Sequence, residues 1–142
     1  MTLVINVKKI NENAKLPFYA TEQAVGADLF STEEVELAPE CHALVGTGIA
    51  VQPDRFCDMQ IRPRSGLAAK HKVTVLNAPG TVDTDYRLEI KVILMNHGKE
   101  IFKINVGDRI AQIVTNPLRA RFIEVQELNE TSRIGGFGST GQ

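Results

Sequence analysis

The sequence has almost no excess charge of either sign. Its 16 lysines and arginines are set against 17 aspartates and glutamates, so the formal net charge at pH 7 is −1. A chain with this balance has no overall attraction to nucleic acid or to an anionic membrane surface. We therefore expect neither as a partner, and any anionic ligand must be held by local groups.

Residues that form disulfides or bind transition metals are also scarce. The two cysteines, Cys41 and Cys57, are not in C-x-x-C spacing, and the histidines are scattered at His42, His71 and His97. This pattern excludes a zinc framework and gives no support to a Cys/His catalytic pair. We expect all five to be structural or surface residues.

Long hydrophobic runs are missing as well. The N-terminal segment MTLVINVKKINENAK has only a short apolar-leaning run before charged residues begin. Such a run fits neither a signal peptide nor a membrane span. We expect a cytoplasmic, reduced protein, and 142 residues are enough for one domain whose core needs no metal or disulfide.

The sequence does contain many short β-branched runs. Eight of them are separated by glycine, proline, asparagine or aspartate: TLVINV, CHALVGTGIAV, FCDMQIRP, VTVL, LEIKVILMN, IFKINV, RIAQIV and RFIEV. Within the third run, Cys57, Met59 and Ile61 alternate with polar residues, which is the period of a half-buried strand. So many strand-like runs in one short chain indicate a β-sandwich, a jelly roll or a small barrel.

Two further segments bear on the architecture. The only helical candidate is Ser65–Lys72, with Ser65 placed as the N-cap. In the run LEIKVILMN, Leu88 and the alternate residues after it share one apolar face, while Ile93 and Met95 lie on the other. We therefore expect that strand to be covered on both sides.

The chain ends in a glycine-rich segment, IGGFGSTGQ, in which Gly136, Gly138 and Gly141 satisfy the pattern G-x-G-x-x-G. In a dinucleotide-binding motif these glycines open a helix whose N-terminus receives a pyrophosphate. Only one residue follows Gly141, so this interpretation fails. We instead divide the chain into a β domain, residues 1–134, and a C-terminal arm, residues 135–142.

Five stretches are too polar or too rich in glycine for a plain sandwich: GADLF, RPRSGLAAK, LNAPGTVDTDYRLEIK, GDRIAQIV and the C-terminal segment. In the second stretch, Arg62 and Arg64 lie beside the expected helix start at Ser65, where free N–H groups favour a phosphate. Each stretch taken alone also fits an ordinary turn or cap. Together they suit polyphosphate chemistry.

In this order and spacing, GADLF, PRSGLA, NAPGTVDTDYRLEI, GDRIAQIV and GGFGSTG resemble the five motifs of the homotrimeric deoxyuridine triphosphate nucleotidohydrolases, the dUTPases. The resemblance runs from about Gly26 to Gly141. It implies an all-β sandwich of jelly-roll or β-clip type with one short helix, and a homotrimer with active sites between subunits and a flexible C-terminal arm. It also implies Mg²⁺-dependent hydrolysis of dUTP to dUMP and pyrophosphate, which keeps uracil out of DNA and supplies dUMP for thymidylate synthesis.

The resemblance assigns the nucleoside side of the site. Asp83 would orient and deprotonate the water that attacks the α-phosphorus, a role open to an ionised aspartate that is well placed. Tyr86 would pack against the deoxyribose and leave no room for a 2′-hydroxyl. The remaining contacts, to uracil and along the following strand, would come from Asn77, Thr81, Val82 and Lys91.

The phosphate side is implied in the same way. Its contacts would be Arg64, Ser65, Gly66 and Gln112, and Asp28 would hold Mg²⁺ through water, as suits a cation that keeps its hydration. In the arm, Phe137 would lie on the uracil, while Arg133, Gly138 and Ser139 would contact the phosphates. Glycines let such a backbone approach an anion and move.

Two departures from the family pattern stand out. Leu88 occupies the position after D-Y-R where the family has glycine, and we expect it to join the apolar face of its strand. The segment RIGGF is one residue shorter than the family's R-G-x-G-G-F. Two alternatives therefore remain open: a dCTP deaminase-type relative, or a nucleotide-binding regulatory member with impaired catalysis. A carbohydrate-binding or capsid jelly roll would leave the five motifs unexplained.

Overall fold

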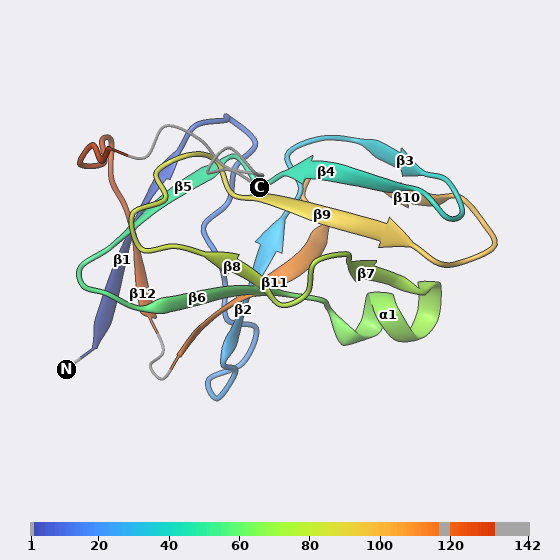
Figure 1. The fold of residues 1–142 in the computed structure, drawn as a ribbon, viewed down its shortest axis with the longest axis horizontal. Helices are drawn as coiled ribbons and strands as arrows, with labels where there is room; N and C mark the ends of the chain where they lie inside the picture. Colours follow the sequence, from blue (N-terminus) through green and yellow to red (C-terminus); the bar gives the residue numbers. More distant parts are fainter. Residues whose placement is uncertain (1, 117–119, 133–142) are drawn as a thin grey trace.

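The structure is a computed structural model that describes residues 2–116 and 120–132 (Figure 1). These residues form strands joined mostly by short turns, together with one helix. In chain order the elements are β1 (Leu3–Lys9), β2 (Gly26–Phe30), β3 (Val35–Leu37), β4 (His42–Gly46), β5 (Ile49–Pro53), β6 (Asp58–Arg62), α1 (Ser65–His71), β7 (Val73–Val75), β8 (Gly80–Val82), β9 (Lys91–Asn96), β10 (Phe102–Ile104), β11 (Arg109–Asn116) and β12 (Ala120–Glu124).

The strands belong to four small sheets. Their strand orders are β12-β1-β5, β10-β3, β2-β11-β6-β8 and β4-β9-β7. All the pairings between named strands are antiparallel except that of β1 with β12. In Figure 1, the sheet containing β1 lies at the end of the molecule opposite α1, and β6 and β11 run between the two ends.

The sheets enclose one continuous hydrophobic core. Ile5, Leu29, Met59, Leu94 and Ile113 come from five different strands, and each is at most 1% exposed. Along β1 and β6 the buried residues alternate with more exposed ones, as the sequence pattern predicts for strands with one covered face. The structure thus confirms a predominantly β architecture with a single short helix.

Two of the sequence runs differ from their expected form. CHALVGTGIAV is not one strand but two, β4 and β5, because Gly48 adopts φ +67° between them, a conformation that glycine tolerates best. In LEIKVILMN the strand begins only at Lys91, and Leu88 is 41% exposed. The prediction that Leu88 joins an apolar strand face is therefore wrong.

Helix α1 forms where expected, but its start differs. The N-cap is Arg64, in extended conformation and without a side-chain cap bond, so Ser65 is the first helical residue. The helix ends at His71, and the C-cap Lys72 has a left-handed φ of +57° and donates its N–H to the Ala68 and Leu67 carbonyls. No residue of α1 is buried. Nowhere in residues 2–116 and 120–132 is a helix long and apolar enough to span a membrane.

Candidate functional site

A cavity of about 240 Å³ lies between β8 and β9. Strand β8 pairs with β6, while β9 pairs with β4 and β7, so the two strands belong to different sheets. The segment between β7 and β8 therefore crosses from one sheet to another and does not fold back as a regular hairpin. Because β8 is the edge strand of its sheet in the described residues, its outer backbone groups are available to a ligand.

This cavity collects the residues that were predicted for the nucleoside. Its lining includes Asn77, Thr81, Val82, Asp83, Tyr86 and Lys91. The apolar part of the wall is core residues of β6, β7 and β9, such as Ile61 and Val75. A mostly apolar wall with a few convergent polar groups is the common form of a small-molecule site.

Asp83 lies at the start of a turn that follows β8. The Tyr86 N–H donates to the Asp83 carbonyl at 3.0 Å and closes this turn. Asp83 is exposed and also lines a second cavity of about 650 Å³ on the side of Phe56 and Cys57. Its carboxylate is thus accessible beside the cavity between β8 and β9. Burial raises the pKa of the Cys57 thiol, which keeps it protonated and a poor nucleophile.

Tyr86 is held rigidly in the cavity wall. The residue is 8% exposed, and its hydroxyl donates to the Glu89 carbonyl at 3.0 Å. The neighbouring Glu89 carboxylate accepts the Gly48 N–H at 3.0 Å and pairs with Lys91 at 3.7 Å. The ring is therefore held beside the turn that carries Asp83, whereas the Lys91 side chain is 41% exposed and makes a loose ion pair.

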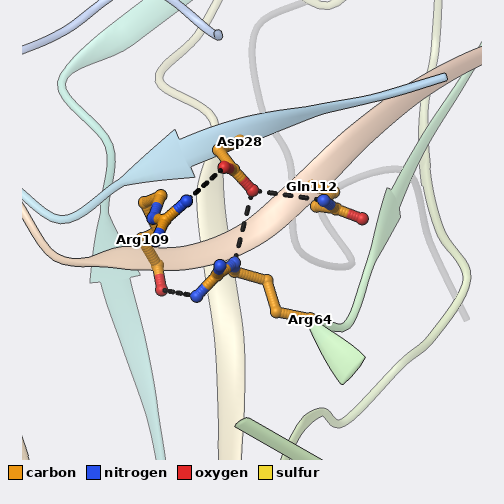
Figure 2. Close-up of polar contacts among 4 residues, drawn as sticks. All are labelled: Asp28, Arg64, Arg109 and Gln112. Atoms are coloured by element: carbon orange, nitrogen blue, oxygen red, sulfur yellow. Dashed lines mark hydrogen bonds and ion pairs between the residues drawn. The ribbon is translucent and has the colours of Figure 1, made fainter. Parts of the chain in front are cut away.

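A second polar cluster surrounds Asp28, whose side chain is 2% exposed (Figure 2). Its carboxylate accepts from Arg64 Nε at 3.3 Å, from Arg109 Nη1 at 3.2 Å and from Gln112 Nε2 at 3.2 Å. A buried carboxylate requires such partners. The side chains of Arg64 and Arg109 are 22% and 49% exposed, so the positively charged members of the cluster, unlike Asp28, are reached by solvent.

Arg109 is a member of this cluster that the sequence analysis missed. It is three residues from Gln112, a spacing that puts the two on opposite faces of a regular strand. A register shift between Arg109 and Ala111 places Arg109 opposite Phe30 and Gln112 opposite Asp28. This bulge turns both side chains to the Asp28 face. The irregularity leaves no clear sign in the sequence.

Other predicted phosphate contacts lie near the cluster but do not join it. Ser65 and Gly66 open α1 and are exposed, next in sequence to Arg64. A Cβ built at Gly66 would have no neighbouring atom within 4 Å, so there is open space beside this residue. Arg62 instead donates to Gln60 Oε1 at 2.7 and 3.0 Å, and the expected convergence of Arg62 with Arg64 is not seen.

Asp28 and the β8 wall of the cavity lie at opposite edges of one sheet, whereas Lys91 of the cavity is on β9 in another sheet. Asp28 is on β2 and Thr81 on β8, with β11 and β6 between them. Strands spaced about 4.8 Å apart separate these edges by roughly 14 Å. Four predicted contacts, Arg133, Phe137, Gly138 and Ser139, lie outside the described residues.

The residues present do not by themselves form a metal centre. The described ranges contain no group of three His, Cys, Asp or Glu that could hold a metal ion. The Asp28 carboxylate is already committed to three donors. Magnesium prefers carboxylates together with substrate phosphates and water, so residues 2–116 and 120–132 offer no all-protein site for it.

Comparison with known proteins settles the family. The dUTPase family model matches residues 12–141. This chain belongs to the dUTPase family. It is 52% identical to the deoxyuridine 5′-triphosphate nucleotidohydrolase of Nautilia profundicola, over 97% of this chain and 99% of that one. It is 54% identical to the enzyme of the same name from Wolinella succinogenes, over 97% and 94% of the two chains.

Solved dUTPase structures share the fold. A variant of the dUTPase from phage phi11 of S. aureus, described with a structural Mg(II) ion, aligns with a TM-score of 0.72 at 24% identity. The alignment covers 94% of this chain and 99% of the phage protein. A Staphylococcus phage 80alpha dUTPase variant with dUpNHpp also has a TM-score of 0.72, at 24% identity, over 98% and 99% of the chains. The all-β, jelly-roll type of fold expected from the sequence is thus confirmed.

Proposed function

We propose that this dUTPase-family chain hydrolyses dUTP to dUMP and pyrophosphate by attack of water on the α-phosphorus. The observation that carries the proposal is the cavity between β8 and β9, because it brings Asn77, Thr81, Val82, Tyr86 and Lys91 together beside an accessible Asp83. Full-length similarity to named nucleotidohydrolases supports the same activity.

In this proposal each wall of the cavity has one task. The outer edge of β8, at Thr81 and Val82, and the side chain of Asn77 read the uracil edge. Tyr86 packs against the deoxyribose, since its buried ring cannot easily move aside. Lys91 contributes a positive charge at the mouth of the cavity. Asp83, at the rim, holds and deprotonates the attacking water.

The triphosphate is assigned to the Arg64 side of the molecule. Arg64 and Arg109, oriented by Asp28, together with Ser65, Gly66 and Gln112, would hold it by charge-assisted hydrogen bonds. We propose that Mg²⁺ arrives with the triphosphate and meets Asp28 through water, because the described residues offer no complete metal site. Bound there, the ion would offset phosphate charge.

In this assignment, the cavity and the Asp28 cluster that bind one nucleotide come from different subunits, so each site needs a second subunit. Asp28 and the β8 wall of the cavity lie at opposite edges of one sheet of the subunit, and we propose that a homotrimer completes each site between subunits. The separation of these residues on one chain supports a site shared between subunits. Arg133, Phe137, Gly138 and Ser139 of the C-terminal arm are proposed to close over the nucleotide. We place the enzyme in the cytoplasm, acting on free nucleotide.

The deciding experiment is a panel of dUTP, dCTP, dTTP and UTP, each with and without Mg²⁺. Pyrophosphate release that is fastest with dUTP and depends on Mg²⁺ is the expected result. Release of ammonia from dCTP would indicate a deaminase instead. Binding of dUTP without any turnover would indicate a regulatory member of the family.

A further inference from the structure

The turn that carries Asp83 is fixed by side chains that have no assigned role. Residues 83–86 lie outside every strand, so their backbone groups need partners from elsewhere. The Asp83 carbonyl accepts the Tyr86 N–H at 3.0 Å. The next two carbonyls accept from side chains: that of Thr84 from Arg87 Nη1 at 2.7 Å, and that of Asp85 from Thr131 Oγ1 at 2.9 Å.

Arg87 makes an unusual set of contacts for an arginine. Besides the Thr84 carbonyl, its Nη1 lies 3.4 Å from the carbonyls of Val51 and Tyr86, and its Nε donates to the Asn129 carbonyl at 3.2 Å. All of its hydrogen bonds in the described structure therefore go to backbone carbonyls. Arginine suits this arrangement because its planar group presents several donors in fixed directions.

These contacts connect the turn to two other parts of the fold. Val51 belongs to β5, and Asn129 lies in the segment that follows β12. That segment is itself attached to the residue after Val51, since the Asn129 N–H donates to Gln52 Oε1 at 2.7 Å. The guanidinium group thus fixes the turn against a core strand and against a distant segment of the chain.

We propose that Arg87 is a positioning residue for Asp83, and that Thr131 assists it from the same segment. The inference rests on the proposed role of Asp83 as the base. An exposed carboxylate on a turn outside the sheets owes its position to such bonds. A displacement of about 1 Å in a catalytic group can lower the rate by roughly 10²-fold.

The test compares Arg87→Gln and Arg87→Lys with wild type. We expect kcat for dUTP to fall by roughly 10- to 100-fold in Arg87→Gln, while KM changes by less than about threefold, since the turn is displaced and the nucleoside contacts are kept. Arg87→Lys should recover only part of the loss, because an ammonium group cannot reach carbonyls on both sides at once. Thr131→Val, which removes one donor, should reduce kcat less.

The matched control is Arg55→Gln. Arg55 also donates to a backbone carbonyl, that of Thr2 at 3.2 Å, and to the adjacent Asp54, but it does not contact the turn. We expect wild-type kcat from this variant. Melting temperatures measured in parallel show whether any loss of rate follows from unfolding. A kcat loss in Arg87→Gln that scales with its folded fraction would overturn the inference.

A second readout does not depend on activity. Amide hydrogen exchange at Tyr86, whose N–H bonds the Asp83 carbonyl, should be faster in Arg87→Gln than in wild type, by about tenfold or more if the turn opens locally. Unchanged exchange would overturn the positioning role whatever the rate. Faster exchange in Arg87→Gln, together with a wild-type protein that fails to hydrolyse dUTP, would support the positioning of the turn and refute the proposed function.

Discussion

At the scale of single residues, the side chains that face the cavity differ from the groups that hold them in position. Asp83 and Tyr86 face the cavity between β8 and β9, while Glu89 fixes Tyr86 through its carbonyl and Gly48 through its carboxylate. Substitutions can therefore remove a proposed chemical role and leave the support in place.

Asp83→Asn removes the proposed base and keeps its shape. We expect kcat to fall by about 10²–10⁴-fold, the usual range for loss of a general base. The affinity for a non-hydrolysable dUTP analogue should change little, because other residues bind the nucleotide. Steady-state kinetics and calorimetric titration measure the two effects, and Asp54→Asn, at an exposed ion pair with Arg55, is the control. Near-wild-type turnover by Asp83→Asn would remove Asp83 from the mechanism.

Tyr86→Ala tests the selection of deoxyribose. Without the ring, the ratio of kcat/KM between dUTP and UTP should narrow, by up to about 10²-fold, since shape alone rarely rejects an added hydroxyl by more. Tyr86→Phe is the matched control, because it removes the hydroxyl that donates to the Glu89 carbonyl at 3.0 Å, keeps the ring, and should keep most of the selectivity. If the alanine variant keeps the wild-type ratio, another group selects the sugar.

From the sequence, a motif could identify residues that lie together in the structure. Prediction failed where local backbone geometry determined a residue's position. The motif NAPGTVDTDY identified residues that share one cavity. Ser65 was wrong as an N-cap, because the chain enters α1 one residue earlier, at an extended Arg64. Arg109 was missed because the bulge after it reverses the face on which it lies, and alternation rules assume a regular strand.

At the scale of elements, short irregular segments set where one strand ends and the next begins. Gly48 separates β4 from β5 with its φ of +67°, and without it the run CHALVGTGIAV would read as one strand. The sequence shows a glycine within the run, but not that the chain passes from one sheet to another there. The start of β9 is similarly hidden, because Leu88 and Ile90 continue the apolar alternation although the strand begins at Lys91.

Gly48→Ala should destabilise the fold strongly. A Cβ at this position would lie 2.8 Å from Asn11 Cβ, 2.8 Å from Thr32 Cγ2 and 2.9 Å from Ala14 Cβ. Left-handed strain and overpacking together should lower the free energy of unfolding by about 2–4 kcal/mol. Urea denaturation measures this change.

The matched control for that substitution is Gly66→Ala. Its Cβ would meet no atom within 4 Å, and alanine favours a helix over glycine by about 1 kcal/mol. The control should therefore be neutral or slightly stabilising. Equal stability of Gly48→Ala and wild type would show that the segment joining β4 to β5 can relax.

At the scale of the whole molecule, the described chain places its last strand well before the arm that was predicted from sequence. Strand β12 ends at Glu124, and the segment after it is fixed near β5 by Asn129. The division into residues 1–134 and 135–142 is thus a prediction about function, and truncation tests it.

Truncation after Ile134 should leave the melting temperature and the proposed trimer unchanged, because no described strand is removed. Loss of Phe137 from the base should lower kcat/KM for dUTP by about 5- to 150-fold, if its stacking contributes roughly 1–3 kcal/mol. Light scattering measures the molar mass of both forms. Unchanged kcat/KM would mean that the arm has no part in the reaction.

The parallel pairing of β1 with β12 has a consequence for how the protein is made. Leu3 is paired with Ala120, so the first strand cannot complete its sheet until almost the entire chain has left the ribosome. At about 5–20 residues per second, the intervening residues take roughly 6–23 seconds to synthesise. During that interval β1 has only β5 as a partner, and its open edge is available to other nascent chains. Slower translation of the second half would lengthen this exposure, whereas a faster ribosome would shorten it.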